Sequence, residues 1–142
     1  MANRARLYIY WLPPILWAVA IFGFSSSIFS SENTGPIVES MLTAIFGYII
    51  KPSTINTIHY LIRKAGHLIE FAILAALLFR AIRGDRKGWN WRWAAAAIAI
   101  AALYAATDEF HQSFVPGRTP SGWDVLLDTT GASLAQVLFF RR

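Results

Sequence analysis

The stretch that decides the fold runs from Asp108 to Asp128 and reads DEFHQSFVPGRTPSGWDVLLD. It places a dense group of polar and ionisable side chains between two strongly apolar segments. An ionisable group close to hydrocarbon is costly unless a partner or water reaches it, so such groups usually mark function. We therefore expect the functional site here, provided that the apolar surroundings are a membrane.

The composition of the chain supports a membrane protein. Apolar residues make up 56% of its 142 residues and charged residues 15%, against roughly 45–50% and about 25% in soluble domains. After loops, this length leaves room for about four spanning helices of ~20 residues each, in a single domain over residues 1–142. Cysteine is absent, which excludes disulfides, thiolate metal ligands and a Cys nucleophile.

The apolar pattern predicts an all-α membrane protein, a small bundle of four transmembrane helices plus one interfacial amphipathic helix. The spanning helices are expected at about residues 7–29, 53–83, 91–112 and 122–140. Between the first two, Gly35-Pro36 opens a shorter segment with Ile37, Met41 and Ile45 at helical spacing. Because this segment is too short to span, we expect an interfacial helix over about 36–50.

Local signals refine two of the helix starts. Pro13 and Pro14 fall early in the first helix, so its regular part is expected to begin there. Lys51-Pro52 separates the interfacial helix from the next one, which Ser53 or Thr54 is expected to cap.

A narrow polar stripe follows the N-terminal half of the 53–83 helix. At about 100° per residue, its four members project within about 80° of one another: His59, Arg63, His67 and Glu70. Lys64 lies just beyond the edge of the stripe. Apolar residues continue the same helix beyond it, so the stripe marks only one end of the predicted bundle.

The distribution of basic residues predicts the orientation. Nine Lys and Arg residues lie at the two termini and in the loop around residues 80–92, and four lie elsewhere. Because basic loops remain cytoplasmic, both termini are predicted to be cytoplasmic in a multi-pass protein of the cell membrane. The polar stripe, the 108–118 segment and the Asp124/Asp128 pair then meet at the outer end of the bundle.

The acidic residues of this region need partners. Asp108 and Glu109 close a helix C-terminus, where the helix dipole disfavours anions, so we expect a buried ion-pair network with Arg63, Lys64 or Arg118. One connected network is expected to join residues from three segments: Glu70, Asp108, His111, Arg118 and Asp128.

The loop itself has structural readings as well. Ser121 to Asp124 fits a capping box, which leaves a functional role for Asp124 open, whereas capping does not explain Asp128 one turn deeper. Pro116-Gly117 fits a type II turn. Arg118 beside that turn either neutralises Asp108 or holds an anion such as phosphate.

Several functional classes lack support. No Walker A, GxGxxG, GxSxG or HExxH motif occurs, and the basic residues follow the ends of apolar segments, so no nucleic-acid partner is expected. His67 and Glu70, with His111 and two carboxylates nearby, could bind a divalent metal. Their spacing is not a zinc signature, so we expect no cofactor and keep a metal as the less favoured reading.

The segments DEFHQSFVPGR, WDVLLDTTGA and RKAGHLIEFAIL resemble the motifs of the VanZ-like family, and the resemblance covers about residues 22–138. It implies a small four-helix bacterial membrane protein of the cell envelope; the family's namesake is associated with resistance to the glycopeptide teicoplanin. Phe71 stands where many members carry Tyr. The positions that match the family's polar residues are Lys64, His67, Glu70, Asp108, Glu109, His111, Gln112, Arg118, Asp124 and Asp128.

Three functions fit these residues. The leading one is binding of a membrane lipid or of the headgroup of a lipid-linked cell-wall intermediate, through Arg63, Lys64, Gln112, Arg118, Asp124 and Asp128. The protein could form a homo-oligomer. The second is an intramembrane enzyme on a phosphate-bearing lipid, with acid–base roles for His67, Glu70, Asp108, Glu109 and His111. The third is a small proton-coupled transporter, which would have to dimerise.

Overall fold

The computed structural model describes residues 2–47 and 51–140. Within these ranges the chain is all-helical, with five α-helices and one 3₁₀ turn and no strand. In chain order the elements are α1 (Ala2–Phe24), η1 (Ser27–Phe29), α2 (Ser31–Phe46), α3 (Pro52–Arg83), α4 (Trp91–Gln112) and α5 (Gly122–Phe140).

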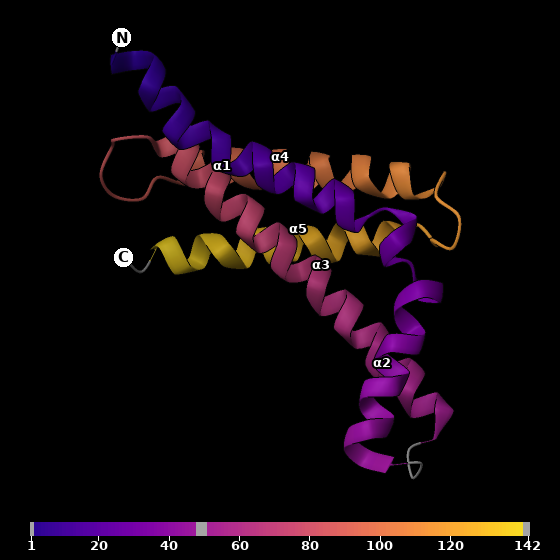
Figure 1. The fold of residues 1–142 in the computed structure, drawn as a ribbon. Coiled ribbons are helices and arrows are strands. Elements are labelled where there is room, and N and C mark those ends of the chain that lie inside the picture. The colour runs from indigo at the N-terminus through magenta and orange to yellow at the C-terminus, as the bar shows by residue number, and fades with distance from the viewer. Residues whose placement is uncertain (1, 48–50, 141–142) are drawn as a thin grey trace.

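Four helices form a bundle and α2 stands apart from it (Figure 1). The long helix α3 crosses the bundle obliquely and packs against α5, α4 and α1, while α2 lies along the N-terminal part of α3. The start of α1, the α3–α4 loop and the C-terminal end of α5 lie at one end of the bundle, and the α4–α5 loop lies at the other (Figure 1). The basic 80s loop and the polar 108–128 segment are therefore at opposite ends.

Three of the described helices are long and apolar enough to cross a membrane: α1 from Arg6, α3 and α4. The fourth bundle helix, α5, has 19 residues and is not among these three. It carries Asp124, Asp128 and Gln136 within an otherwise apolar sequence. The polar groups of α5 are buried inside the bundle instead.

The core is built on small residues. In α4 the buried alanines recur at Ala94, Ala97, Ala101 and Ala105, one face of the helix, and the same face continues to Asp108. These alanines pack with larger side chains of α3, among them Phe71, Leu74, Leu78 and Phe79. Because this face packs against the bundle, the polar residues at the C-terminal end of α4 are buried as well.

Helices α3 and α5 make the closest approach. A Cβ placed on Gly131 would collide with the backbone carbonyl of Leu68. Only glycine lets two helix backbones come this close, and the adjacent Ala132 is also fully buried. Small residues on α5 therefore form its contact with α3.

The first helix differs from its expected bounds at both ends. It begins at Ala2 and continues through Pro13 and Pro14, rather than starting at the prolines. It ends at Phe24 rather than near 29, because Ser25 leaves the helix and donates its hydroxyl to Asp108. The next residues form η1.

The second helix begins at Ser31, five positions before the expected start at 36, and Pro36 lies inside it. Ser30 sets this start, since its carbonyl accepts from the backbone N–H and the hydroxyl of Thr34. The helix ends at Phe46, followed by Gly47 at φ +71°. The remainder of the expected interfacial helix, residues 48–50, lies outside the described residues.

The other three helices follow the sequence pattern closely. Helix α3 begins at Pro52, with Lys51 as the N-cap residue, so the prediction of a Ser53 or Thr54 cap is wrong. Proline at the first helical position explains the difference, because its missing N–H needs no partner there. Helices α4 and α5 occupy residues 91–112 and 122–140, the ranges expected from the sequence.

Candidate functional site

Two hollows flank the N-terminal half of α3. The first, called here the inner cavity, has a volume of about 440 Å³ and is lined by Phe24, Ser25, Thr34, Ile37, Val38, His59, Ile62, Arg63, Gly66, His67, Glu70 and Arg118. The second, called the polar groove, is also about 440 Å³ and is lined by Asn56, His59, Tyr60, Arg63, Lys64, His67, Thr119, Pro120, Ser121 and Asp124. One wall of α3 separates them.

The polar stripe forms that wall. His59, Arg63 and His67 line both hollows, whereas Glu70 faces only the inner cavity and Lys64 only the polar groove. The helical spacing that defined the stripe in the sequence therefore places its residues on one side of α3, as expected. His59 also contacts α2, since its Nε2 lies 3.0 Å from the hydroxyl of Thr34.

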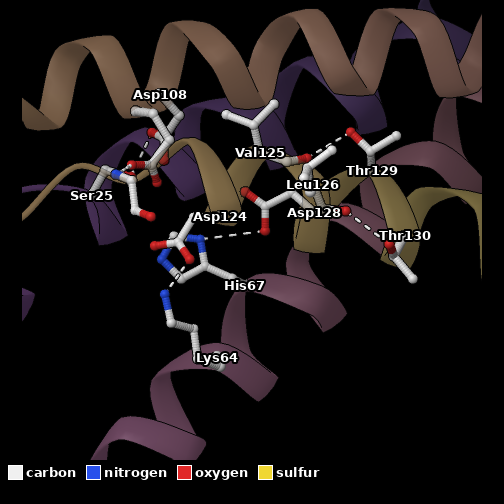
Figure 2. A network of polar contacts seen from close by, with 12 residues as sticks. Ser25, Lys64, His67, Asp108, Asp124, Val125, Leu126, Asp128, Thr129 and Thr130 are labelled. Atoms are coloured by element: carbon white, nitrogen blue, oxygen red, sulfur yellow. Dashed lines mark hydrogen bonds and ion pairs between the residues drawn. The ribbon is translucent and has the colours of Figure 1, made fainter.

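Asp124 pairs with a cation across the groove. The ammonium of Lys64 bonds to Oδ1 of Asp124, so α3 and the start of α5 are joined by an ion pair (Figure 2). The backbone N–H of Asp124 donates to the carbonyl of Ser121 at 2.9 Å, but its side chain does not cap Ser121, whose N–H donates to Glu109 instead. The hydroxyl of Ser121 accepts from the N–H of Trp123 at 3.3 Å. The serine of the expected capping box therefore accepts a bond from the first turn of α5, while the carboxylate of Asp124 forms the ion pair with Lys64.

Asp108 is held by neutral donors. Its Oδ1 accepts from the hydroxyl of Ser25 at 2.5 Å, and its Oδ2 accepts from the side-chain amide of Gln112 at 2.8 Å. Both partners are buried, as is Asp108. The expected ion pair with Arg63, Lys64 or Arg118 is not among the contacts of the described residues. The serine that follows α1 and the amide of Gln112 bond to the two carboxylate oxygens instead.

Glu109 is buried beside Asp108 and faces the start of α5. Its Oε2 accepts from the backbone N–H of Ser121 at 2.7 Å. Its other oxygen, Oε1, is buried without a hydrogen-bond partner. Glu109 thus fixes the loop that precedes α5 and keeps one oxygen available.

His67 and Asp128 face each other in the interior. Nδ1 of His67 lies 3.5 Å from Oδ1 of Asp128 (Figure 2), and Asp128 is fully buried. Neither Asp128 oxygen has a hydrogen bond. A buried carboxylate without a hydrogen bond is costly, so the imidazole beside it is its principal electrostatic partner.

Arg118 lies at the turn, as predicted. Gly117 has φ +74°, and the N–H of Arg118 donates to the carbonyl of Val115 at 3.2 Å, which is the expected turn geometry. The guanidinium donates to the carbonyls of Phe24 and Ser26, the latter at 3.2 Å, and so ties the loop to the end of α1. Burial lowers the pKa of Arg118, and the nearby charge of Arg63 lowers it further.

His111 is placed away from both hollows. Its ring packs on Phe22 of α1, with centroids 4.3 Å apart, and it lines neither the inner cavity nor the polar groove. Hydrogen bonds do not join the expected network of five residues: Arg118 bonds to carbonyls at and after the end of α1, and Asp108 bonds to Ser25. Arg118 still lies close enough to Asp108 and Glu70 to interact with their charges.

Sequence reasoning missed two partners of this site, Ser25 and Thr34, and it expected Ser121 as a helix cap but not its backbone bond to Glu109. Ser25 opens the serine run that follows the first apolar segment, and that run is visible in the sequence. Its specific partner is not, because Asp108 lies 83 positions away in the chain.

One group of side chains has the composition of a metal site. His67, Asp108 and Glu109 each offer a ligand atom, and these three atoms lie within 4.8 Å of one another. This group differs from the one considered from the sequence, since Glu70 and His111 are not part of it.

The sequence model of the VanZ/LLP1 family matches residues 10–141, nearly the whole chain. No curated protein and no solved structure matches it.

Proposed function

The chain belongs to the VanZ/LLP1 family, and from this membership and the two hollows beside α3 we propose that it is a cell-envelope membrane protein that binds the headgroup of a lipid or a lipid-linked cell-wall intermediate. The observation that carries the proposal is the shared wall of α3, where His59, Arg63 and His67 border both hollows.

The lining of the inner cavity fits an amphipathic ligand. Ile37, Val38 and Ile62 offer apolar surface suited to an acyl or prenyl chain, while Arg63 and Arg118 bring cations suited to a phosphate. The polar groove continues from the same wall to Lys64. A ligand that is apolar at one end and anionic at the other matches both.

The proposed topology has four spans and one interfacial helix. In it α5 is the fourth span, its polar residues turned inward, and α2 lies in the outer interface, where its exposed Ile37, Met41 and Ile45 contact lipid. Both termini are cytoplasmic, because the nine basic residues are at that end.

Cysteine labelling tests the orientation, since the chain has no cysteine of its own. Lys87→Cys in the α3–α4 loop and Ser113→Cys after α4 are both exposed and at opposite ends. An impermeant thiol reagent is expected to label only Ser113→Cys in intact cells. Labelling of Lys87→Cys alone would reverse the proposed orientation.

Lipid binding is tested by measuring which lipids remain on the purified protein and which bind again after delipidation. Wild type is expected to prefer phosphate-bearing anionic lipids over zwitterionic ones, and Arg63→Gln and Arg118→Gln are expected to lose that preference. Arg86→Gln is the matched control: Arg86 also donates to backbone carbonyls, but in the α3–α4 loop. Equal lipid preference in all four proteins would contradict the proposal.

A contribution to glycopeptide resistance is the cellular form of this proposal. Expression in a susceptible strain is expected to raise the teicoplanin concentration needed for inhibition, and Arg63→Gln is expected to abolish the increase at unchanged membrane abundance. A loss of resistance that follows the loss of folded protein would point to a structural role for the cation.

An intramembrane enzyme on the same lipids is the second candidate, favoured by the buried His67–Asp128 contact of 3.5 Å. A carboxylate that orients an imidazole is the arrangement of a general base, and Glu70 lies beside His67 in the inner cavity. The test is incubation with a phosphate-bearing lipid: released phosphate in wild type and none in His67→Gln would establish the enzyme.

A further inference from the structure

We infer that His67, Asp108 and Glu109 form a binding site for a divalent transition-metal ion, open toward the wall between the inner cavity and the polar groove. The three ligand atoms lie within 4.8 Å of one another. Ligands at about 2.0–2.2 Å from a tetrahedral zinc ion stand roughly 3.4 Å apart, so the three side chains have to move closer together to bind it.

The first argument is the charge of the interior. Asp108, Glu109 and Asp128 are three buried carboxylates within one region of the bundle, and no Lys or Arg of the described chain forms an ion pair with any of them. Lys64 is already paired with Asp124. Buried anions need a compensating charge or a proton, and a divalent cation supplies two positive charges at the point where the carboxylates converge.

The second argument is the set of atoms without partners. Glu109 is 6% exposed, and its Oε1 has no hydrogen bond, although Oε2 is bonded to Ser121. Nδ1 of His67 is likewise buried without a hydrogen bond, 3.5 Å from Oδ1 of Asp128. In a folded interior such polar atoms are expected to be satisfied by protein, water or an ion.

The third argument is that each ligand has its own orienting partner. Ser25 and Gln112 hold the two oxygens of Asp108, the N–H of Ser121 holds Glu109, and Asp128 lies beside the imidazole of His67. Metal ligands in proteins are oriented by such neighbouring groups, and a ligating imidazole usually has a carboxylate, a backbone carbonyl or a water at its other nitrogen.

The ligand set favours zinc or a similar ion. One imidazole nitrogen and two carboxylate oxygens leave at least one coordination position open. Of the three ligands only His67 lines the two hollows, so a headgroup phosphate would approach the ion from the side of His67. The metal site itself is independent of lipid binding and stands or falls separately.

The test is the metal content of the protein purified in detergent with an affinity tag that contains no histidine. Wild type, treated with a chelator and then offered zinc, is expected to retain one zinc ion per chain and to melt at a higher temperature than without zinc. Asp108→Asn and Glu109→Gln are expected to lose the ion, and Asp128→Asn to bind it about 10–100-fold more weakly through misorientation of His67. Asp85→Asn, an exposed acid at the other end of the bundle, is the control and is expected to bind as wild type does.

Melting temperatures without metal separate the outcomes. Glu109→Gln keeps an acceptor for the Ser121 N–H, so it is expected to fold. Two results together would overturn the site: wild type takes up no zinc or manganese, and the Asn and Gln variants melt at or above the melting temperature of wild type. They would show that the carboxylates hold protons instead of a metal ion. Equal zinc binding by wild type and His67→Gln would mean an adventitious ion only, and would overturn it too.

Discussion

The two halves of α3 have the same helical geometry and opposite environments. None of the residues from Pro52 to Gly66 is buried, whereas buried residues recur from His67 to Ala81. The C-terminal half packs into the bundle, and the N-terminal half extends from it with α2 alongside (Figure 1). Both hollows lie on the N-terminal half.

The difference shows how one helix can be both scaffold and site. Packed residues of the C-terminal half fix the position of α3, and the N-terminal half then places His59, Arg63 and His67 between the two hollows. His67 is the point of transition, since it is both buried and a lining residue. Substitutions in the two halves are therefore expected to differ in kind.

The largest effect is expected from a leucine pair on α3. Leu74 is 2% exposed and Leu61 is 57% exposed. Leu74→Ala removes packed atoms and is expected to lower the free energy of unfolding by about 2–5 kcal/mol, whereas Leu61→Ala is expected to change it by less than about 0.5 kcal/mol. Unfolding in detergent measures both, and a similar loss for the two variants would mean that the halves are equally packed.

A glycine pair gives a smaller effect with opposite signs. Gly131→Ala drives a methyl group into the Leu68 backbone and is expected to cost about 1–3 kcal/mol. Gly66→Ala meets no atom within 4 Å and is expected to stabilise α3 by about 0.5–1 kcal/mol. Thermal unfolding of the two variants beside wild type decides. Destabilisation by Gly66→Ala would indicate a partner in the inner cavity that a methyl group displaces.

The smallest effect is expected for the ion pair across the groove. In a double-mutant cycle with Lys64→Met and Asp124→Asn, the coupling energy is expected to be roughly 1 kcal/mol, because water still reaches Lys64. High salt is expected to lower it. A coupling of zero would mean that packing alone joins the N-terminal half of α3 to α5.

Much of this architecture follows from the sequence. The apolar segments place α3, α4 and α5, because runs of apolar residues of this length are helices that need a non-aqueous surrounding. The Gly117 turn and the stripe on α3 follow from positive φ and from helical periodicity. The start of α2 did not follow, since Pro36 is the strongest local signal there and the bonds of Ser30 and Thr34 outweigh it.

The sequence by itself determined that the chain is helical and apolar, and which side chains are candidates for the site, because these depend on local periodicity and on the cost of polar groups beside hydrocarbon. Only the tertiary structure decided which candidates meet. Ser25 rather than an arginine holds Asp108, Arg118 bonds to the end of α1, and His111 turns to Phe22. Such pairings depend on how closely the helices approach one another and at what angle. The contact of Gly131 with Leu68 and the alanine face of α4 set this geometry. Both join residues far apart in the chain, so no local sequence pattern encodes it.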